Sequence, residues 1–187
     1  MIKVEKKVRA TLEKILAVLE EKSVYVGIPK SNTVRPEEGM TNATLLAIHS
    51  KGSPVRGLPA RPVIEPAIED PENKATISKE LIAAARKKLK GDEAGYLQGL
   101  NAAGLQAQNV CQDWFENPKN GWEPLAEATV KAKLYKALKG AERKKAMAGY
   151  EEAKSADESV TMQSHFGVIP LVDTNEMRKA ITYVVEE

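Results

Sequence analysis

The sequence has little of what catalysis and metal binding usually require. Its 187 residues include one cysteine, Cys111, and two histidines, His49 and His165. A single cysteine excludes an internal disulfide and a cysteine-rich zinc site, and two histidines leave few ligands for a histidine-based metal centre. We therefore expect no catalytic residues, no cofactor and no metal, and a protein that is not an enzyme.

The sequence also has almost no excess of one charge sign, few aromatic residues and no long apolar run. There are 28 Lys+Arg against 26 Asp+Glu, a net charge of +2, and only 5% of residues are aromatic. Dedicated nucleic-acid binders usually have a basic excess and stacking aromatic side chains, so this balance argues against one. No window approaches the roughly 18 apolar residues of a membrane span, and the first residues contain no apolar signal core. We expect a cytoplasmic protein with no membrane partner.

What is present predicts one α+β domain over residues 1–187. Hydrophobic residues make up 42% of the chain and charged residues 29%, a balance typical of globular proteins. We expect a long amphipathic N-terminal helix and two or three further helices packed on a small, mostly antiparallel sheet. The N-terminal helix is indicated by Val8, Leu12, Ile15 and Leu19, which share one face at helical spacing. Strand-like runs occupy residues 23–29 and 181–185.

Capping residues predict where the other helices begin and end. Thr41 or Asn42 begins a short helix that stops at Gly52. Asp70 caps a helix that begins at the following proline, and a second long helix follows a break over residues 91–95. A third helix begins near Leu125 and continues through residues 131–145.

Three shorter segments have local signals of their own. Residues 50–66 contain four of the ten prolines, which predicts extended, irregular chain. Residues 150–164 are acidic and polar and show no convincing core face. Asp173 with Glu176 resembles a capping box for a short helix before the last strand.

The two residues with the most reactive side chains have structural interpretations. His49 follows Leu45, Leu46 and Ile48, a setting typical of a half-buried, hydrogen-bonded helix histidine rather than a catalytic one. Cys111 lies on a predicted helix face with no cationic neighbour to activate its thiol. We expect it to be a small core residue.

Residues 131–145 carry the strongest electrostatic pattern, with seven basic residues and one acidic residue. Its interpretation stays open between a solvated helix face, contact with DNA phosphates, and contact with an acidic segment of another subunit. Such head-to-tail contacts between copies close into rings when the rotation permits. The charge-patch candidates are Lys131, Lys136, Lys139, Arg143 and Lys144 on the basic side and Glu151 and Glu152 on the acidic side.

Five segments in order carry a family resemblance. They are VYVGIP at 24–29, TNATLLAIH at 41–49, LPARPVIEPAI at 58–68, EPLAEAT at 123–129, and PLVDT at 170–174 with its continuation to residue 183. Together they resemble tail-completion and head–tail joining (neck) proteins of tailed bacteriophages, including Mu-like virion morphogenesis proteins. The resemblance singles out fourteen residues with structural or interface roles: Gly27, Pro29, Asn42, His49, Pro59, Arg61, Pro62, Pro66, Pro124, Leu125, Thr129, Asp173, Thr174 and Arg178.

The chain departs from the family pattern at two places. Asn175 stands where the family usually has glycine, and asparagine is the residue that best tolerates positive φ, so we expect the turn to be kept. Residues 134–167 are longer than the family pattern and constitute an atypical insertion. Arg61 has two interpretations: a bidentate contact with a carboxylate of a neighbour, or an intramolecular anchor for its proline-rich segment.

The resemblance implies a structural virion protein. It would form a homo-oligomeric ring of roughly six or twelve copies at the head–tail junction, complete or terminate the tail, and let DNA pass. Its partners would be other copies of itself and the neighbouring neck, connector and tail-tube proteins, first in the host cytoplasm and then in the virion. Two alternatives remain: a tail-assembly chaperone absent from the mature virion, and a DNA-binding protein that uses residues 131–145.

Overall fold

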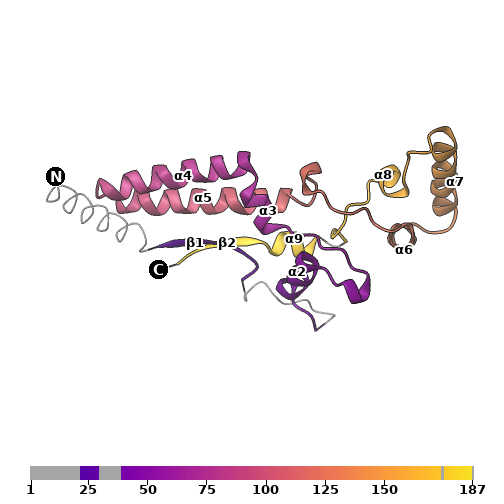
Figure 1. Cartoon of the computed structure of the whole chain (residues 1–187), viewed down its shortest axis with the longest axis horizontal. Helices are drawn as coiled ribbons and strands as arrows, with labels where there is room; N and C mark the ends of the chain where they lie inside the picture. The colour runs from indigo at the N-terminus through magenta and orange to yellow at the C-terminus, as the bar shows by residue number, and fades with distance from the viewer. Residues whose placement is uncertain (1–21, 30–38, 174, 187) are drawn as a thin grey trace.

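A computed structural model describes residues 22–29, 39–173 and 175–186 of the chain. Over these residues it is mostly helical with one two-stranded antiparallel sheet, which confirms the α+β class, but the expected two or three further helices are eight α-helices. The predicted N-terminal helix lies outside the described residues. In Figure 1 the α4–α5 hairpin covers the strand pair at one end, α6, α7 and α8 lie at the other end, and α2, α3 and α9 lie between them.

Both predicted strands are present and pair with each other. β1 (Ser23–Gly27) runs antiparallel to β2 (Thr182–Glu186), with Tyr25 opposite Val184. One face of the sheet packs on the helical hairpin through Val24, Val26 and Val185. The ring of Tyr25, on the alternate face, is 56% exposed. The β-branched residues thus form a sheet with one covered face, as short strands require for stability.

The two long helices form a hairpin: the cap at Asp70 is confirmed, and the second helix begins inside the break predicted over residues 91–95. α4 (Pro71–Leu89) begins after Asp70, whose carboxylate accepts the first free N–H groups, and α5 (Glu93–Asp113) begins after Asp92 in the same way. The helices approach closely where α5 has glycine: a β-carbon at Gly99 would lie 2.6 Å from that of Ala84. This stripe of small residues therefore brings the helices into close contact.

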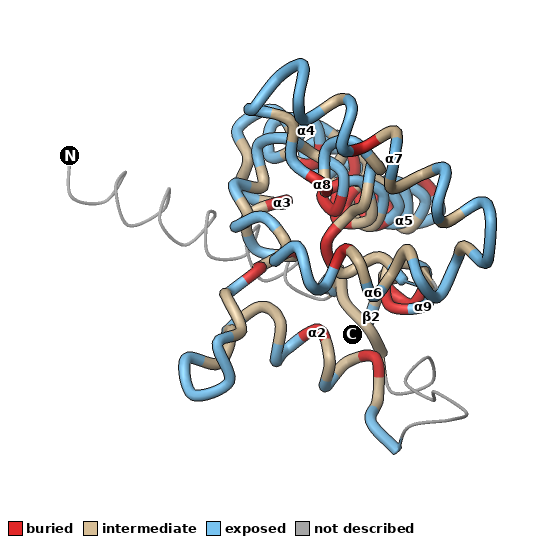
Figure 2. Tube along the Cα trace, turned by 90° about the vertical axis from the view of Figure 1, so that its right-hand side faces the viewer, coloured by how far each residue is buried: buried red, intermediate tan, exposed pale blue. Residues whose placement is uncertain are grey.

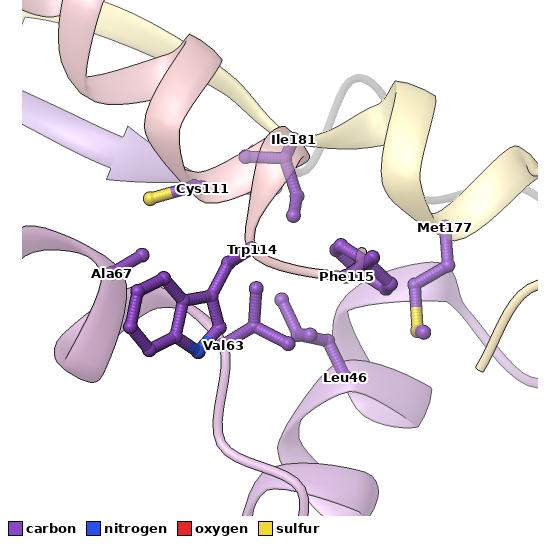
Figure 3. Close-up of a cluster of buried hydrophobic side chains, with 8 residues drawn as sticks. All are labelled: Leu46, Val63, Ala67, Cys111, Trp114, Phe115, Met177 and Ile181. Carbon is purple, nitrogen blue, oxygen red and sulfur yellow. The ribbon is translucent and has the colours of Figure 1, made fainter. Parts of the chain in front are cut away.

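The main core lies where the hairpin, the middle helices and the chain before β2 meet. α2 (Asn42–Lys51) begins after its cap Thr41 and ends at Gly52, as predicted, and α9 (Glu176–Ala180) packs beside it. Figure 3 shows the buried side chains, which come from α2, α3, α5, α9 and the segments beside them. They are Leu46, Val63, Ala67, Cys111, Trp114, Phe115, Met177 and Ile181. The expectation that Cys111 is a core residue is confirmed, since it is fully buried.

The prediction that residues 50–66 are irregular throughout is wrong at both ends. A short 3-10 helix η2 (Pro54–Arg56) and the start of α3 (Ile64–Glu69) interrupt the segment. Pro66 lies in the first turn of α3, where a missing N–H costs nothing because the first helical N–H groups have no intrahelical acceptor. The prolines therefore place the helix starts as well as stiffening the loop.

The third helix breaks where the sequence predicted continuity. α6 (Glu127–Ala137) ends at Leu138, which is extended, and α7 (Gly140–Ala156) starts a new helix at Gly140 with φ of +54°. A short helix η3 (Pro118–Asn120) precedes α6, and α8 (Met162–Phe166) follows α7. The predicted third helix is thus two helices with a bend between them.

The expectation that residues 150–164 lack a core face is also wrong. Tyr150 and Met162 are 2% and 1% exposed and pack on Val130 of α6 in a second cluster. The predicted insertion therefore carries apolar residues of a core, with Met147 one turn before Tyr150 on α7, and they meet Val130 only because α7 and α8 fold back. Figure 2 shows buried residues in short stretches that alternate with exposed turns.

The turn before α9 corrects one expectation and confirms another. Asn175 itself is the N-cap, with φ of +61°, and its side chain makes no capping bond. The predicted capping box of Asp173 with Glu176 is therefore wrong, because Glu176 is the first residue of the helix. The positive φ expected of Asn175 is confirmed.

Candidate functional site

Half of the residues singled out by the family resemblance line one cleft, which we call the α2–α6 cleft. It has a volume of about 610 Å³ and lies between α2, residues 57–61, residues 123–136 and residues 171–177. These segments are distant in sequence, and in Figure 1 α2 and α9 lie in the middle of the molecule, between the hairpin and the end that carries α6. The predicted residues that line it are His49, Pro59, Arg61, Pro124, Leu125, Thr129 and Asp173.

Arg61 is the most buried charged group in the cleft wall. It is only 5% exposed, and its Nη2 donates to the main-chain oxygen of Glu123 at 2.8 Å. Its Nε has no acceptor. Burial lowers the pKa of the guanidinium, while the nearby Glu123 carboxylate raises it. The intramolecular anchor that the sequence allowed is therefore present: Arg61 joins its proline-rich segment to the chain that leads into α6.

His49 lies next to Arg61 at the end of α2. Its main-chain oxygen accepts the N–H of Arg61 at 2.7 Å, which fixes the two residues relative to each other. The imidazole is half-buried as expected, but its Nδ1 has no hydrogen-bond partner, so the expected hydrogen bond at that atom is absent. Burial lowers the pKa of His49, and the charge of Arg61 lowers it further.

Two lysines of α6 complete the basic side of the cleft. Lys133 Nζ donates to the main-chain oxygens of Val172 and Ile169 at 2.6 and 3.2 Å, and its pKa is lowered chiefly by burial. Lys136, one turn further on, pairs with Asp173 at 2.9 Å. Thr129, Ala132, Lys133 and Lys136 recur at helical spacing, so they present one face of α6 to the cleft while Val130 faces the second core.

The remaining motif residues lie outside the cleft. Gly27 ends β1 and Pro29 follows it, and Asn42 is buried in the first turn of α2. The main-chain oxygen of Pro62 accepts Trp122 Nε1 at 3.1 Å, and Pro66 belongs to α3. Arg178 pairs with Glu116 and with Asp113 on α5. Thr174 lies outside the described residues. Among the described residues, Pro62 and Arg178 thus connect distant segments of the fold rather than lining the cleft.

The basic and acidic stretches divide into engaged and solvent-facing side chains. The guanidinium of Arg143 lies 4.2 Å from the ring centre of Tyr135 and donates to the main-chain oxygens of Leu138 and Tyr135, so it bridges α6 and α7. Lys131 is half-buried. Side chains that face solvent include those of Lys139, Lys144, Lys145, Glu151 and Glu152. Some of the basic residues thus have structural contacts, and the charge count alone does not distinguish them from the residues that face solvent.

Two contributors to this region were not singled out by the sequence motifs. Lys133 holds the chain before Asp173 through two carbonyls. Trp122 packs edge-on against Phe115 with ring centres 5.9 Å apart. Its position between two prolines, Pro118 and Pro124, was the only available signal of a fixed conformation.

The described residues were also searched for metal-ligand clusters, membrane-spanning helices and a reactive thiol. Within them, no group of three His, Cys, Asp or Glu residues is placed to hold a metal ion, and no helix is long and apolar enough to cross a membrane. Burial raises the pKa of the Cys111 thiol to about 12, which keeps it protonated and unreactive. Comparisons with protein-family models, curated proteins and solved structures gave no match to this chain.

Proposed function

We propose that the protein is a structural subunit of a tailed-bacteriophage neck. It assembles as a ring of roughly six or twelve copies at the head–tail junction, completes or terminates the tail, and lets DNA pass through the ring. Its function is the geometry of the oligomer and the two surfaces that meet the neck or connector and the tail tube. No reaction is involved.

One observation carries this proposal. Seven motif residues that the family resemblance identifies, taken from segments as far apart as residues 49 and 173, line the same cleft. Motif residues that serve only local turns would be scattered over the fold. Their convergence supports a shared role, and an open cleft beside the outermost helices is a natural place for contact with a neighbouring subunit.

The shape of the molecule is consistent with such a role. The α4–α5 hairpin and the α6–α8 unit lie at opposite ends, with the cleft beside the second of them (Figure 1). An elongated subunit with different surfaces at its two ends suits heterologous contacts, which close into rings.

The test is assembly. Light scattering coupled to size exclusion measures the mass of the purified chain, and electron microscopy compares phage tails made with and without the protein. We expect a closed oligomer and tails that fail to join heads when the protein is missing. A persistent monomer together with normal joining overturns the proposal.

The two alternatives have separate tests. A chaperone is absent from finished particles, so a stoichiometric peptide signal in the mass spectrum of purified virions excludes that role. DNA binding by residues 131–145 would depend on Lys139, Lys144 and Lys145, which face solvent. Neutralising these three would abolish a steep salt-dependent affinity, whereas Arg143 and Lys136 already have intramolecular partners.

A further inference from the structure

One apolar row of α4 is buried near its start and exposed toward its end. The row consists of Ile77, Leu81, Ala85 and Leu89, which recur every four residues and therefore lie on one side of the helix. Ile77 is buried, whereas Leu81 and Leu89 are 38% and 52% exposed. Ile82, next to this row, is 53% exposed. We call Leu81, Ile82, Ala85 and Leu89 the α4 patch. A contiguous apolar patch of this kind on a helix marks a surface that packs against another element.

The chain that precedes β1 has an apolar row of its own. Residues 1–21 lie outside the described part of the chain, and their sequence places on one helical face Val8, Leu12, Ile15 and Leu19. At the rise of an α-helix this row would be about 16 Å long, and the row of α4 is about 18 Å long. The two rows therefore match in chemistry and in length.

The position of β1 brings this segment to the α4 patch. Val24 packs on the cluster that contains Ala84 of α4, and Val26 packs on the cluster that contains Ile77, so β1 runs antiparallel to α4. In Figure 1 β1 begins toward the end of the hairpin where α4 passes into α5. The chain before β1 therefore enters the described structure beside the exposed part of the α4 row.

The connection and the charges favour a segment that folds back along α4. Residues 20–22 connect Leu19 to β1, and helix–strand connections of about two to six residues are common. A helix that ends near Leu19 can thus run parallel to α4, with Leu19 near Leu89. Glu20 and Glu21 then approach the last turn of α4, which contains the basic residues Arg86, Lys87 and Lys88. These opposite charges add a small attraction.

The outer face of the sheet fits this segment less well. Tyr25 and Val184 are its apolar residues. The other residues that alternate onto the same face are small or polar: Ser23, Gly27, Thr182 and Glu186. The α4 patch therefore offers the larger continuous apolar surface.

We propose that residues 1–21 dock as an amphipathic helix on the α4 patch of the same chain. The row of four apolar residues in this segment covers Leu81, Ile82 and Leu89, and the acidic pair that follows it lies at the basic end of α4. The inference goes beyond the proposed function and does not depend on it, because it concerns the packing within a single copy.

Paired cysteines test the contact in the full-length chain. Leu12→Cys/Leu81→Cys places one thiol in each row, and Leu12→Cys/Leu105→Cys is the matched control. Leu105 is an exposed leucine of α5 outside the α4 patch. It lies at a similar height along the hairpin, because Ile77 packs with Ala107. The native thiol is fully buried and leaves a low background. We expect a short bismaleimide to link the first pair within one chain at least about tenfold faster than the control pair.

Hydrogen exchange provides a second measurement. Leu81→Ser removes one apolar contact of the α4 patch, and Leu105→Ser makes the same change outside it. We expect the amides of residues 8–19 to exchange roughly tenfold faster in Leu81→Ser than in Leu105→Ser, because less apolar area then holds the segment in place. The amides of α5 report in both variants whether the hairpin is still folded.

Equal rates of crosslinking for the two cysteine pairs overturn the proposal, as does equal exchange of residues 8–19 in two folded serine variants. A crosslink that joins two chains also overturns it, because the segment would then cover α4 of a neighbouring copy. Oligomeric mass and tail joining are measured separately, so the failure of this proposal is distinguishable from the failure of the proposed ring.

Discussion

The aromatic ring of Tyr183 on β2 lies directly on Gly104 of α5. A β-carbon at position 104 would lie 2.7 Å from Cγ of Tyr183 and closer still to Cδ2. The absence of a side chain at Gly104 therefore sets the distance between the sheet and the helix that covers it. Tyr183 Oη bonds Asn101 one turn earlier on the same helix, at 3.2 Å, and fixes the ring in this position.

This contact predicts a large cost for the smallest substitution. Gly104→Ala should lower the free energy of unfolding by about 1–3 kcal/mol, because the ring or the helix must move. The control is Gly149→Ala in α7, where nothing lies within 4 Å of the added methyl group. That variant should gain about 0.5–1 kcal/mol from helix propensity. Urea unfolding of both variants measures the difference, and a stabilised Gly104→Ala protein would contradict the packing described here.

Removal of the Arg61 guanidinium should loosen the join between two distant segments. Arg61→Met keeps most of the side-chain volume but leaves the carbonyl of Glu123 without its donor. We expect a loss of about 1–3 kcal/mol of unfolding free energy. Arg56→Met, at an exposed position in η2, is the matched control and should change stability by less than about 0.5 kcal/mol. Equal effects of the two would show that the buried contact contributes nothing.

His49 predicts a loss of stability in mild acid. Its pKa in the folded chain lies below the usual 6.5, so below that pH the unfolded chain takes up a proton that the folded chain resists. Stability from this group is present above pH 6.5 and decreases as pH falls from there toward the lowered pKa. Glu123 and Lys133 line the same cleft and Arg61 is adjacent.

The measurement compares urea unfolding of the wild type and His49→Gln between about pH 7.5 and pH 5.5. The difference between the two proteins isolates the histidine from carboxylates that titrate in the same range. The variant should show a shallower loss of stability on acidification. Parallel pH profiles would contradict the expectation.

The Cys111 thiol should be inert in the folded protein. Its pKa is raised to about 12 by burial, and its Sγ contacts the main-chain oxygen of Ile64 at 3.9 Å. A thiol reagent at pH 8 should therefore label the native chain only as fast as it opens, and label it at once in denaturant. Rapid stoichiometric labelling of the native chain would show that the core around Cys111 is open.

Local signals in the sequence predicted the parts of the fold that depend on neighbours along the chain. Asp70, Thr41 and Gly52 mark helix ends because caps act within about three residues of the residues they satisfy. The same range explains why Asn175 could be expected to adopt positive φ. The bend at Leu138 was not predicted, although Gly140, two residues further on, is a poor helix former and has a φ of +54° at the start of α7.

The sequence motifs identified residues of the candidate site, but they did not predict that these residues would lie together in one cleft. Its members are 40 or more positions apart in several cases, and no periodicity connects residues such as His49, Arg61 and Asp173. Lys133 belongs to a basic stretch, and nothing near it in sequence indicates that its contacts come from residues 169 and 172.

The sequence by itself determined the helix caps, the two strands, the burial of Cys111 and the scarcity of reactive side chains, because each depends on composition or on contacts a few residues long. Only the tertiary structure decided that the motif segments meet in one cleft, that Tyr150 and Met162 form a core, and that Gly104 receives Tyr183. Those outcomes depend on how distant segments pack, and packing depends on the shapes of all the side chains between them at once.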